Sequence, residues 1–467
     1  MASRRLYGIA VSASLAALSI GVVATAANAA PGGPGGGPGG GSTSAAASST
    51  GTASSTASST GSSTASSTAS STSSSGTCGS SASTTYGSYS QSSGTTTLSG
   101  DIFTNTTSDS ESVLVTGGTL NLSNDKVTKL GGDSSSSSNS SLYGTNAGVL
   151  ANSTGAVNLS NTAISTTAAG ANGLFATGSS ASVSMSGCSI TATGSYSHGA
   201  DVTEGATATL SDVTVSTSGI HSSAIATDTG GGTMTVTGGT ISATGTYSAG
   251  LYSTGVLTAT DATVTSGADC AAVMDSDNSL YLNSDTLTGA TEGVKLWNTD
   301  GTIAGYDTVL LNGGSLTATA DDGFYVVDAD ANITAENAAT ISAGSGLLVD
   351  AVTGSTVNFT GTGETLTGEV YGDSTSTVTT KLASTSTLTG KIENSAVTLD
   401  STSKWDVTGN SVITTLSDTS GISGTTVSNI VGNGYIVYYN SSDNSSLGGK
   451  TYTLSGGGYH EPSSSPE

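Results

Sequence analysis

Positively charged residues are scarce in this chain of 467 residues, which has nine Lys and Arg against 33 Asp and Glu. The formal net charge is −24, and the only arginines are Arg4 and Arg5, near the N-terminus. Binding to nucleic acid needs clustered basic side chains that neutralise phosphates, and the sequence has no such cluster. Attraction to anionic polysaccharides or to anionic membrane surfaces is disfavoured for the same reason.

Cysteine and long hydrophobic runs are also rare. The chain has three cysteines, Cys78, Cys188 and Cys270, and an odd number so far apart does not form a disulfide framework. Beyond the run from Ile9 to Val23 no apolar segment approaches 18 residues, so we expect no transmembrane helix in the mature chain. Charged residues are only 9% of the chain, which leaves Ser, Thr, Gly and Asn to form most of the surface.

The first 29 residues have the features of a secretory signal peptide. Arg4 and Arg5 precede an apolar stretch, and Ala27-Asn28-Ala29 provides the small residues of a cleavage site. The segment Ser3 to Tyr7 resembles a twin-arginine export signal, and ordinary Sec export fits the sequence equally well. We therefore expect a secreted, extracellular or cell-surface protein.

A low-complexity segment follows the signal peptide. Pro31 to Gly41 is rich in Pro and Gly, and Ser42 to Gly76 consists mainly of Ser, Thr and Ala. Such a composition has no apolar residues with which to build a core. We predict that residues 30–93 form a disordered linker, in which Cys78 is a candidate for pairing between chains, and that residues 460–467 form a disordered tail.

A short pattern recurs between Leu120 and Leu366. A small residue marks each repeat, and consecutive markers are 21 to 30 residues apart in the sequence. The markers are Gly148, Gly173, Gly199, Ala224, Gly250, Ala272, Gly293, Gly323 and Gly346. Repeats of this length that are built from short Thr-, Val- and Ile-rich segments predict a β-solenoid.

One repeat, Ala147 to Thr166, indicates how a coil is built. Apolar residues alternate with polar ones in three short segments, which places the apolar set on one face. Stacking of the coils would bury this face, and we expect Cys188 and Cys270 inside it. A turn position between the second and third segments suits the left-handed conformation. It is occupied by Asn161, Gly187, Asp212, Gly238 and Asp261.

These features predict an all-β fold, a right-handed parallel β-helix with three short strands per coil. The repeat resembles those of pectin-degrading enzymes, phage tailspikes and bacterial adhesin passengers. We assign residues 94–366 to the coils and residues 367–459 to the C-terminal end and cap of the β-helix. The aromatic segments Gly434 to Asn440 and Lys450 to Leu454 would cover the open edge of the last coil.

The C-terminal region resembles the end of autotransporter adhesin passengers, which carry a Trp-x-Val-Thr-Gly-x-Ser strand pair. We expect its apolar set to be Trp405, Val407, Val412 and Leu416. Autotransporters continue into a membrane β-barrel that has no counterpart here up to Glu467, so we expect that the chain does not translocate itself.

The sharpest enzymatic pattern is Asn298-Thr299-Asp300 followed by Asp321-Asp322. It resembles motifs of the polygalacturonases, in which carboxylates one coil apart act as acid and base. The resemblance implies that Asp300, Asp321 and Asp322 would be catalytic. The His and Arg-x-Lys motifs of that family are missing, and its anionic substrate requires a basic cleft. We therefore predict no catalytic set.

We likewise predict no cofactor and no metal site. The three histidines, His198, His221 and His460, are not spaced as metal ligands, and we expect them in exposed turns. The aspartates 321, 322, 328 and 330 could bind Ca²⁺ weakly, although turn aspartates are usually only solvated.

The sequence favours a non-enzymatic adhesive or structural role, with surface glycans, host cells or abiotic surfaces as partners. The contacts are expected in the irregular segments Gly131 to Gly144 and Gly293 to Gly323. A polysaccharide hydrolase is the alternative. Ice binding is a minor alternative, because Thr-x-Thr pairs such as Thr207/Thr209 and Thr286/Thr288 recur, although in different strands of the coil.

Overall fold

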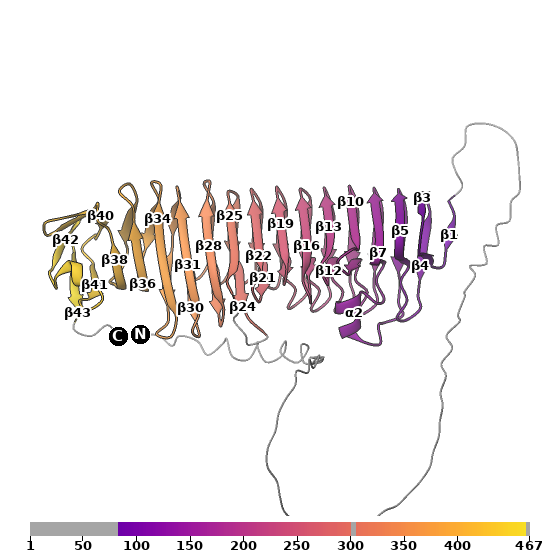
Figure 1. Cartoon of the computed structure of the whole chain (residues 1–467), viewed down its shortest axis with the longest axis horizontal. Helices are drawn as coiled ribbons and strands as arrows, with labels where there is room; N and C mark the ends of the chain where they lie inside the picture. The colour runs from indigo at the N-terminus through magenta and orange to yellow at the C-terminus, as the bar shows by residue number, and fades with distance from the viewer. Residues whose placement is uncertain (1–82, 300–304, 464–467) are drawn as a thin grey trace, which may run out of the picture. The chain divides into compact units, whose positions relative to one another are not determined.

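The computed structural model describes residues 83–299 and 305–463, which form an all-β solenoid of about 15 turns (Figure 1). The predicted fold class is confirmed, because three short strands per coil pair in parallel with those of the neighbouring coils. The predicted signal peptide, residues 30–82 of the predicted linker, Cys78 and residues 464–467 lie outside the described residues.

We call the stack formed by the first strand of each coil the first ladder. Its members are β2 (Tyr89–Gln91), the first half of β5 (Val113–Ser123) and of β7 (Val149–Ser160), β9 (Leu174–Thr177), β12 (Ala200–Thr203), β15 (Ile225–Thr227), β18 (Leu251–Ser253), β21 (Ala272–Asp275), β24 (Val294–Trp297), β27 (Phe324–Val327), β30 (Leu347–Val352), β33 (Glu369–Gly372) and the first half of β36 (Ile392–Leu399).

The second strands form the second ladder. Its members are β3 (Thr95–Ser99), the second halves of β5 and β7, β10 (Ser182–Ser186), β13 (Ala206–Ser211), β16 (Gly232–Thr237), β19 (Val256–Thr260), β22 (Ser279–Asn283), β25 (Asp307–Asn312), β28 (Asp330–Glu336), β31 (Thr356–Thr362), β34 (Thr377–Ala383) and the second half of β36.

The third strands form the third ladder. Its members are β1 (Thr85–Tyr86), β4 (Ile102–Asn105), β6 (Lys126–Lys129), β8 (Ala163–Thr166), β11 (Ser189–Ala192), β14 (Thr214–Thr217), β17 (Thr240–Ala243), β20 (Thr263–Ser266), β23 (Thr286–Gly289), β26 (Ser315–Ala318) and β29 (Thr340–Ala343). The same side continues with β32 (Thr365–Thr367), β35 (Thr387–Gly390), β37 (Lys404–Val407) and β40 (Thr426–Val431).

Alternation along each strand places one set of side chains inside the coil, and stacking makes these sets into continuous apolar rows. In the second ladder, for example, Leu257 pairs with Leu280, and both are fully buried. The predicted turn position is confirmed, since Asn161, Asp212 and Asp261 have φ values of 48°, 51° and 55°. Cys188 and Cys270 are buried free thiols, as predicted.

Two of the repeat markers are wrong by one or two residues. Ala272 pairs with Leu251, so the residue equivalent to Gly250 is Ala271. Phe324 pairs with Val349, which makes Leu348 rather than Gly346 the equivalent of Gly323. Two adjacent alanines make the choice ambiguous in the first of these coils, and the marker position accepts the larger Leu348 in the second, so a rule based on small residues misplaces both.

The coils begin earlier than the predicted boundary at residue 94. Strand β1 starts at Thr85 and β2 at Tyr89, and their tyrosines close the first coil. The ring of Tyr86 stacks on Phe103 with centroids 5.0 Å apart, and Tyr89 contacts Phe103 edge-on at 5.9 Å. Because aromatic rings bury a large apolar area, these tyrosines order residues that we assigned to the linker.

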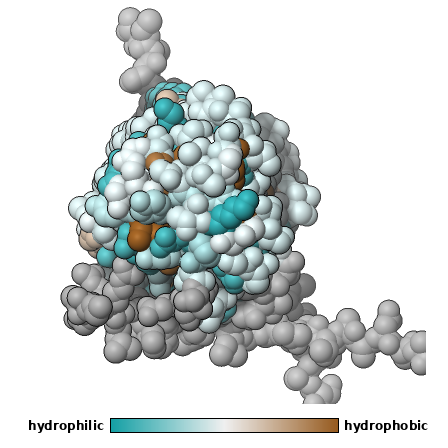
Figure 2. Space-filling model, turned by 90° about the vertical axis from the view of Figure 1, so that its left-hand side faces the viewer, coloured by the Kyte–Doolittle hydropathy of each residue, from teal (hydrophilic) through white to brown (hydrophobic). Residues whose placement is uncertain are grey.

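The C-terminal end contains β38 (Ser411–Ser417), β39 (Ile422–Ser423), β41 (Ile436–Asn440), β42 (Tyr452–Ser455), β43 (Tyr459–Ser463) and the short 3-10 helix Ser445–Leu447. Strand β42 pairs antiparallel with β43, which includes fully buried His460 and extends into the predicted tail. This end of the stack is mainly hydrophilic, with isolated apolar residues (Figure 2).

The predicted apolar set of this region is partly wrong. Trp405, Val407 and Leu416 are buried as predicted, and the indole N–H of Trp405 donates to the Gly390 carbonyl at 2.9 Å. Val412, however, is only half-buried, and Ile413 is buried in its place. Irregular pairing between β36 and β38 shifts the register, which strict alternation cannot predict.

The segment Gly131 to Gly144, which we treated as an irregular polar loop, contains the helix α2 (Ser137–Tyr143). The Ser136 hydroxyl caps its N-terminus by accepting from the Asn139 N–H at 3.2 Å, and Gly144 ends it in the left-handed conformation. Its run of Ser residues gave little sign of a helix, because Ser has a low helix propensity.

We predict that the inward rows carry the stability of the stack. Leu257 is fully buried, whereas its neighbour Val256 on β19 is 39% exposed. Leu257→Ala should lower the free energy of unfolding by about 2–5 kcal/mol, because it leaves a cavity. Val256→Ala should cost less than about 1 kcal/mol. Urea unfolding followed by circular dichroism measures both variants, and equal losses would contradict this assignment.

Candidate functional site

One outward row of the first ladder differs from the rest of the surface. Its residues pair in register from coil to coil, and most of them are large, aromatic, apolar or charged. We call it the first-ladder row, and it consists of Leu114, Leu150, Phe175, Asp201, Ala226, Tyr252, Val273, Lys295, Tyr325, Asp350, Tyr371 and Glu393.

The outward face of the third ladder has the opposite character. From coil to coil its two rows contain only hydroxyl side chains between β11 and β29. One row is Ser189, Thr214, Thr240, Thr263, Thr286, Ser315 and Thr340, and the other is Thr191, Ser216, Ser242, Thr265, Thr288, Thr317 and Ser342. Ice binding was a minor alternative because Thr-x-Thr pairs recur in the sequence. Some of these pairs lie on the third ladder, but others, such as Thr207 and Thr209, lie on the second ladder.

Helix α2 covers the N-terminal part of the first-ladder row. Leu150 and Phe175 are buried there, and a Cβ atom added at Gly144 would lie 2.4 Å from the Phe175 ring. The Thr203 hydroxyl donates to the Leu142 carbonyl of the helix at 2.9 Å. Asp201 and Ala226 in the next two coils are buried as well, so beyond the helix the row first becomes partly exposed at Tyr252.

An aromatic stack borders the row at this point. Tyr196, His221 and Tyr247 occupy equivalent turns before β12, β15 and β18, each with a positive φ between 52° and 56°. Their rings stack almost parallel, with centroids 5.1 and 5.0 Å apart. The left-handed backbone of each turn directs three rings into one column, one ring per coil.

A small pocket lies between this stack and the next part of the row. Its walls include Tyr247, Tyr252, Asp269, Val273, Lys295 and Trp297. The Lys295 ammonium lies 4.2 Å from the centroid of the Trp297 ring, a cation–π contact. The Tyr252 hydroxyl donates to Asp275 at 3.0 Å, and the Thr299 hydroxyl and N–H donate to the same carboxylate at 2.8 and 3.0 Å.

Burial controls the protonation of the groups around the pocket. Burial, with smaller effects from the Asp275 and Asp228 carboxylates, raises the pKa of Tyr252 well above its usual value. Burial also raises the pKa of Asp275, although the hydrogen bonds from Thr299 and Tyr252 oppose the change. The pocket thus combines apolar ring surfaces with hydrogen-bond acceptors, in a volume of about 70 Å³.

Cys270 lies next to this pocket, but its surroundings do not activate it. The thiol donates to Glu292 at 3.2 Å and to Asp269 at 3.4 Å. Burial and then these two carboxylates raise its pKa well above the usual value. A thiol in this environment stays protonated and is not a nucleophile.

The residues implied by the hydrolase resemblance are only partly visible. Asp300 lies outside the described residues. Asp321 is half-buried and Asp322 is buried, and both occupy the turn before β27. The Ser345 hydroxyl donates to Asp322 at 2.6 Å, while burial raises the pKa of the Asp322 carboxyl. Asp322 therefore has a structural partner one coil later, and its role in catalysis stays a hypothesis.

The prediction of three exposed histidines is wrong for two of them. His198 is 9% exposed and His460 is fully buried, while His221 is half-buried in the aromatic stack. The Nδ1 atom of His198 lies 3.3 Å from the Ser223 carbonyl, and that of His460 lies 3.0 Å from the Val437 carbonyl. Stacked turns of successive coils bury His198, whereas His460 lies in β43 and packs against the rings of Tyr439 and Tyr452.

His198 also belongs to a group that sequence reasoning missed. His198, Asp201 and Asp228 each offer one potential ligand atom, and these three atoms lie within 4.8 Å of one another. The four aspartates that we considered for Ca²⁺ are not in this group, namely Asp321, Asp322, Asp328 and Asp330. Alignment of the coils by their markers could have revealed Asp201, because it stands two residues after Gly199, in the column of Phe175 and Tyr252.

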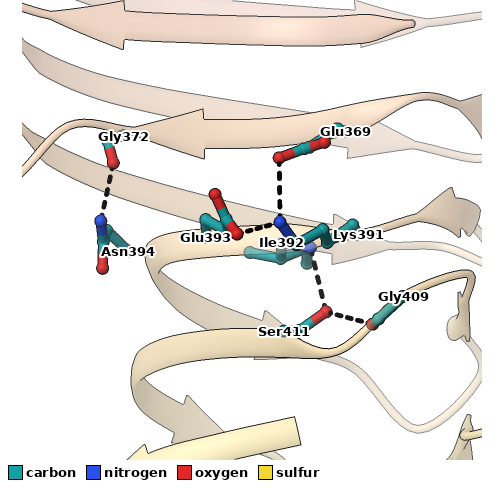
Figure 3. A network of polar contacts seen from close by, with 8 residues as sticks. All are labelled: Glu369, Gly372, Lys391, Ile392, Glu393, Asn394, Gly409 and Ser411. Atoms are coloured by element: carbon teal, nitrogen blue, oxygen red, sulfur yellow. Dashed lines mark hydrogen bonds and ion pairs between the residues drawn. The ribbon is translucent and has the colours of Figure 1, made fainter. Parts of the chain in front are cut away.

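The far end of the first-ladder row carries an ion-pair network (Figure 3). Lys391 contacts Glu393 of the row and lies 3.6 Å from Glu369 of β33. The Ser411 hydroxyl accepts a hydrogen bond from the Ile392 N–H at 3.3 Å. It donates to the Gly409 carbonyl at 3.1 Å. This network links three successive coils in the region where each coil contains fewer residues than the earlier coils do. We assign it a structural role.

A scan against protein families finds no match for this chain, and a comparison with curated proteins finds none either. The resemblance to autotransporter passengers therefore rests on the sequence motifs alone. The helices in the described part of the chain are too short and too polar to cross a membrane.

Two buried aspartates should make the solenoid more stable in mild acid. Burial raises the pKa of Asp285 to about 6 and that of Asp307 to about 7, from an ordinary 3.8. Between pH 4 and 7 the folded state therefore keeps protons that the unfolded state releases. Stability should fall as pH rises through this interval.

Asp307→Asn should raise the melting temperature at pH 7 and flatten its dependence on pH. The amide oxygen can still accept from the Asn278 N–H, which lies 3.0 Å from the carboxylate. Asp261→Asn, at an exposed turn, is the matched control and should change little. Melting curves from pH 4 to 7.5 test this, and an unchanged slope for Asp307→Asn would contradict the assignment.

Proposed function

We propose that the protein is a secreted or cell-surface binding protein that attaches to glycans through the middle of the first-ladder row. The observation that carries this proposal is the stack of Tyr196, His221 and Tyr247 beside the pocket at Tyr252 and Trp297. Aromatic rings pack against the C–H faces of sugars, and carboxylates accept hydrogen bonds from their hydroxyl groups.

The charge of the chain selects the kind of glycan. A net charge of −24 repels anionic polysaccharides, so the ligand should be neutral or carry amino groups. Asp269 lines the pocket, where its carboxylate would accept from sugar hydroxyls, while buried Asp275 holds the Tyr252 hydroxyl in place. Lys295 is the one lysine that lines the pocket, and its ammonium group lies over the Trp297 ring.

The regular stack supports an adhesive rather than a catalytic role. It presents the same row over many coils, and such a surface suits an extended polymer whose units repeat. The sequence supports display outside the cell, because it begins with the features of a signal peptide and continues with a Ser/Thr/Ala-rich spacer. Direct binding to host or abiotic surfaces would use the same exposed rows.

A hydrolase remains the alternative, with Asp300, Asp321 and Asp322 as its residues. It predicts release of reducing sugar from neutral glycans that is lost in Asp321→Asn and Asp322→Asn. The binding proposal predicts that these variants bind like the wild type, because they lie outside the stack of Tyr196, His221 and Tyr247.

The test is binding of the purified protein to an array of neutral, amino and acidic glycans. Tyr247→Ala should weaken binding roughly tenfold or more, because truncation removes both a stacked ring and a wall of the pocket. Tyr435→Ala, at a tyrosine that is 39% exposed near the C-terminal end, is the matched control and should bind normally. Melting temperatures show that both variants are folded.

Unchanged binding by Tyr247→Ala would contradict the proposal. If substitutions in the hydroxyl rows of the third ladder abolish binding instead, the ligand contacts that face. Absence of binding to every glycan at micromolar protein would leave a structural role in the cell envelope as the function.

A further inference from the structure

Three side chains that could bind a metal ion converge on the first-ladder row. His198 ends the turn before β12, Asp201 is the outward residue of β12, and Asp228 follows β15 one coil later. One atom from each side chain lies within 4.8 Å of the others. In-register pairing of β12 and β15 fixes this arrangement, because Asp201 pairs directly with Ala226.

Asp201 lacks the partners that a buried carboxylate needs. Its side chain is only 1% exposed, and its oxygens have no hydrogen-bond partner of normal geometry, although the backbone N–H groups of Val202 and Asp228 weakly favour its charged form. A buried, unpaired charge is costly, so it is usually neutralised by a proton or by a cation. The charge of Asp228 lies close enough to raise this cost.

The orientation of His198 leaves one nitrogen for a metal ion. Its Nδ1 atom lies 3.3 Å from the Ser223 carbonyl, to which an Nδ1–H group donates. The Nε2 atom is then the unprotonated one and can act as a ligand. A histidine whose other nitrogen donates to a carbonyl is the usual arrangement around protein-bound metals.

We propose that His198, Asp201 and Asp228 bind one divalent transition-metal ion of the zinc class. Two carboxylates and a neutral imidazole balance a charge of +2. One nitrogen and two oxygens suit zinc, which takes three protein ligands and leaves a further position open. Calcium requires six to eight oxygen ligands, which these residues do not supply.

The metal would join two neighbouring coils in the buried part of the first-ladder row, next to the contact between α2 and Thr203. Its ligands come from β12 and its preceding turn and from the end of β15, so its binding should stabilise the stack. This proposal does not depend on glycan binding, because it rests on the three ligands alone.

The full chain, freed of metal with a chelator, is titrated with Zn²⁺, Co²⁺ and Ca²⁺ in separate calorimetric experiments. We expect one Zn²⁺ per chain, a melting temperature raised by a few degrees, and visible absorption bands with Co²⁺. Asp201→Asn and His198→Gln should each weaken Zn²⁺ binding by at least about 100-fold. Asp261→Asn, an exposed turn carboxylate, should bind like the wild type.

The variants also separate metal binding from a loss of folding. Asp201→Asn removes an unpaired buried charge, so without metal its melting temperature should equal or exceed that of the wild type. Absence of Zn²⁺ binding at pH 7.5 would overturn the proposal and mean that a proton neutralises Asp201. Equal binding by the wild type and both ligand variants, or binding of Ca²⁺ alone, would overturn it as well.

Discussion

Parallel, in-register pairing between successive coils is the constraint on which the rest of this structure depends. It gives each side chain the equivalent residue of the coil before and of the coil after as its nearest neighbours. Buried positions therefore form apolar rows, such as the one through Leu257 and Leu280, and turns form rows of their own. The surroundings of a residue are therefore set by its position in such a row.

The same constraint concentrates the chemistry of this protein on one side of the coil. The third ladder exposes Ser and Thr hydroxyls without charge between Ser189 and Ser342, whereas the first-ladder row carries aromatic, carboxylate and ammonium groups. Helix α2 covers the start of that row, and the ion pairs of Lys391 occupy its end. The coils between them hold both the aromatic stack and the group around Asp201.

The sequence was sufficient for the fold class, the coil length and the left-handed turn position at Asn161, because each depends on local residue type. It was insufficient where neighbours from other coils decide the outcome. His198 is buried by stacked turns, and Val412 faces outward because pairing with β36 is irregular. The grouping of His198, Asp201 and Asp228 depends on which side chains of β12 and β15 meet across neighbouring coils, and the residues of one coil alone do not reveal this.

The distance between equivalent residues on one ladder tests the stacking most directly. Thr191 and Thr317 belong to one row and are separated by five steps of pairing, through Ser216, Ser242, Thr265 and Thr288. Spin labels on Thr191→Cys and Thr317→Cys should give a narrow distance distribution near 24 Å in double electron–electron resonance, since paired strands are about 4.8 Å apart. A broad distribution, or a mean distance above about 35 Å, would contradict in-register stacking.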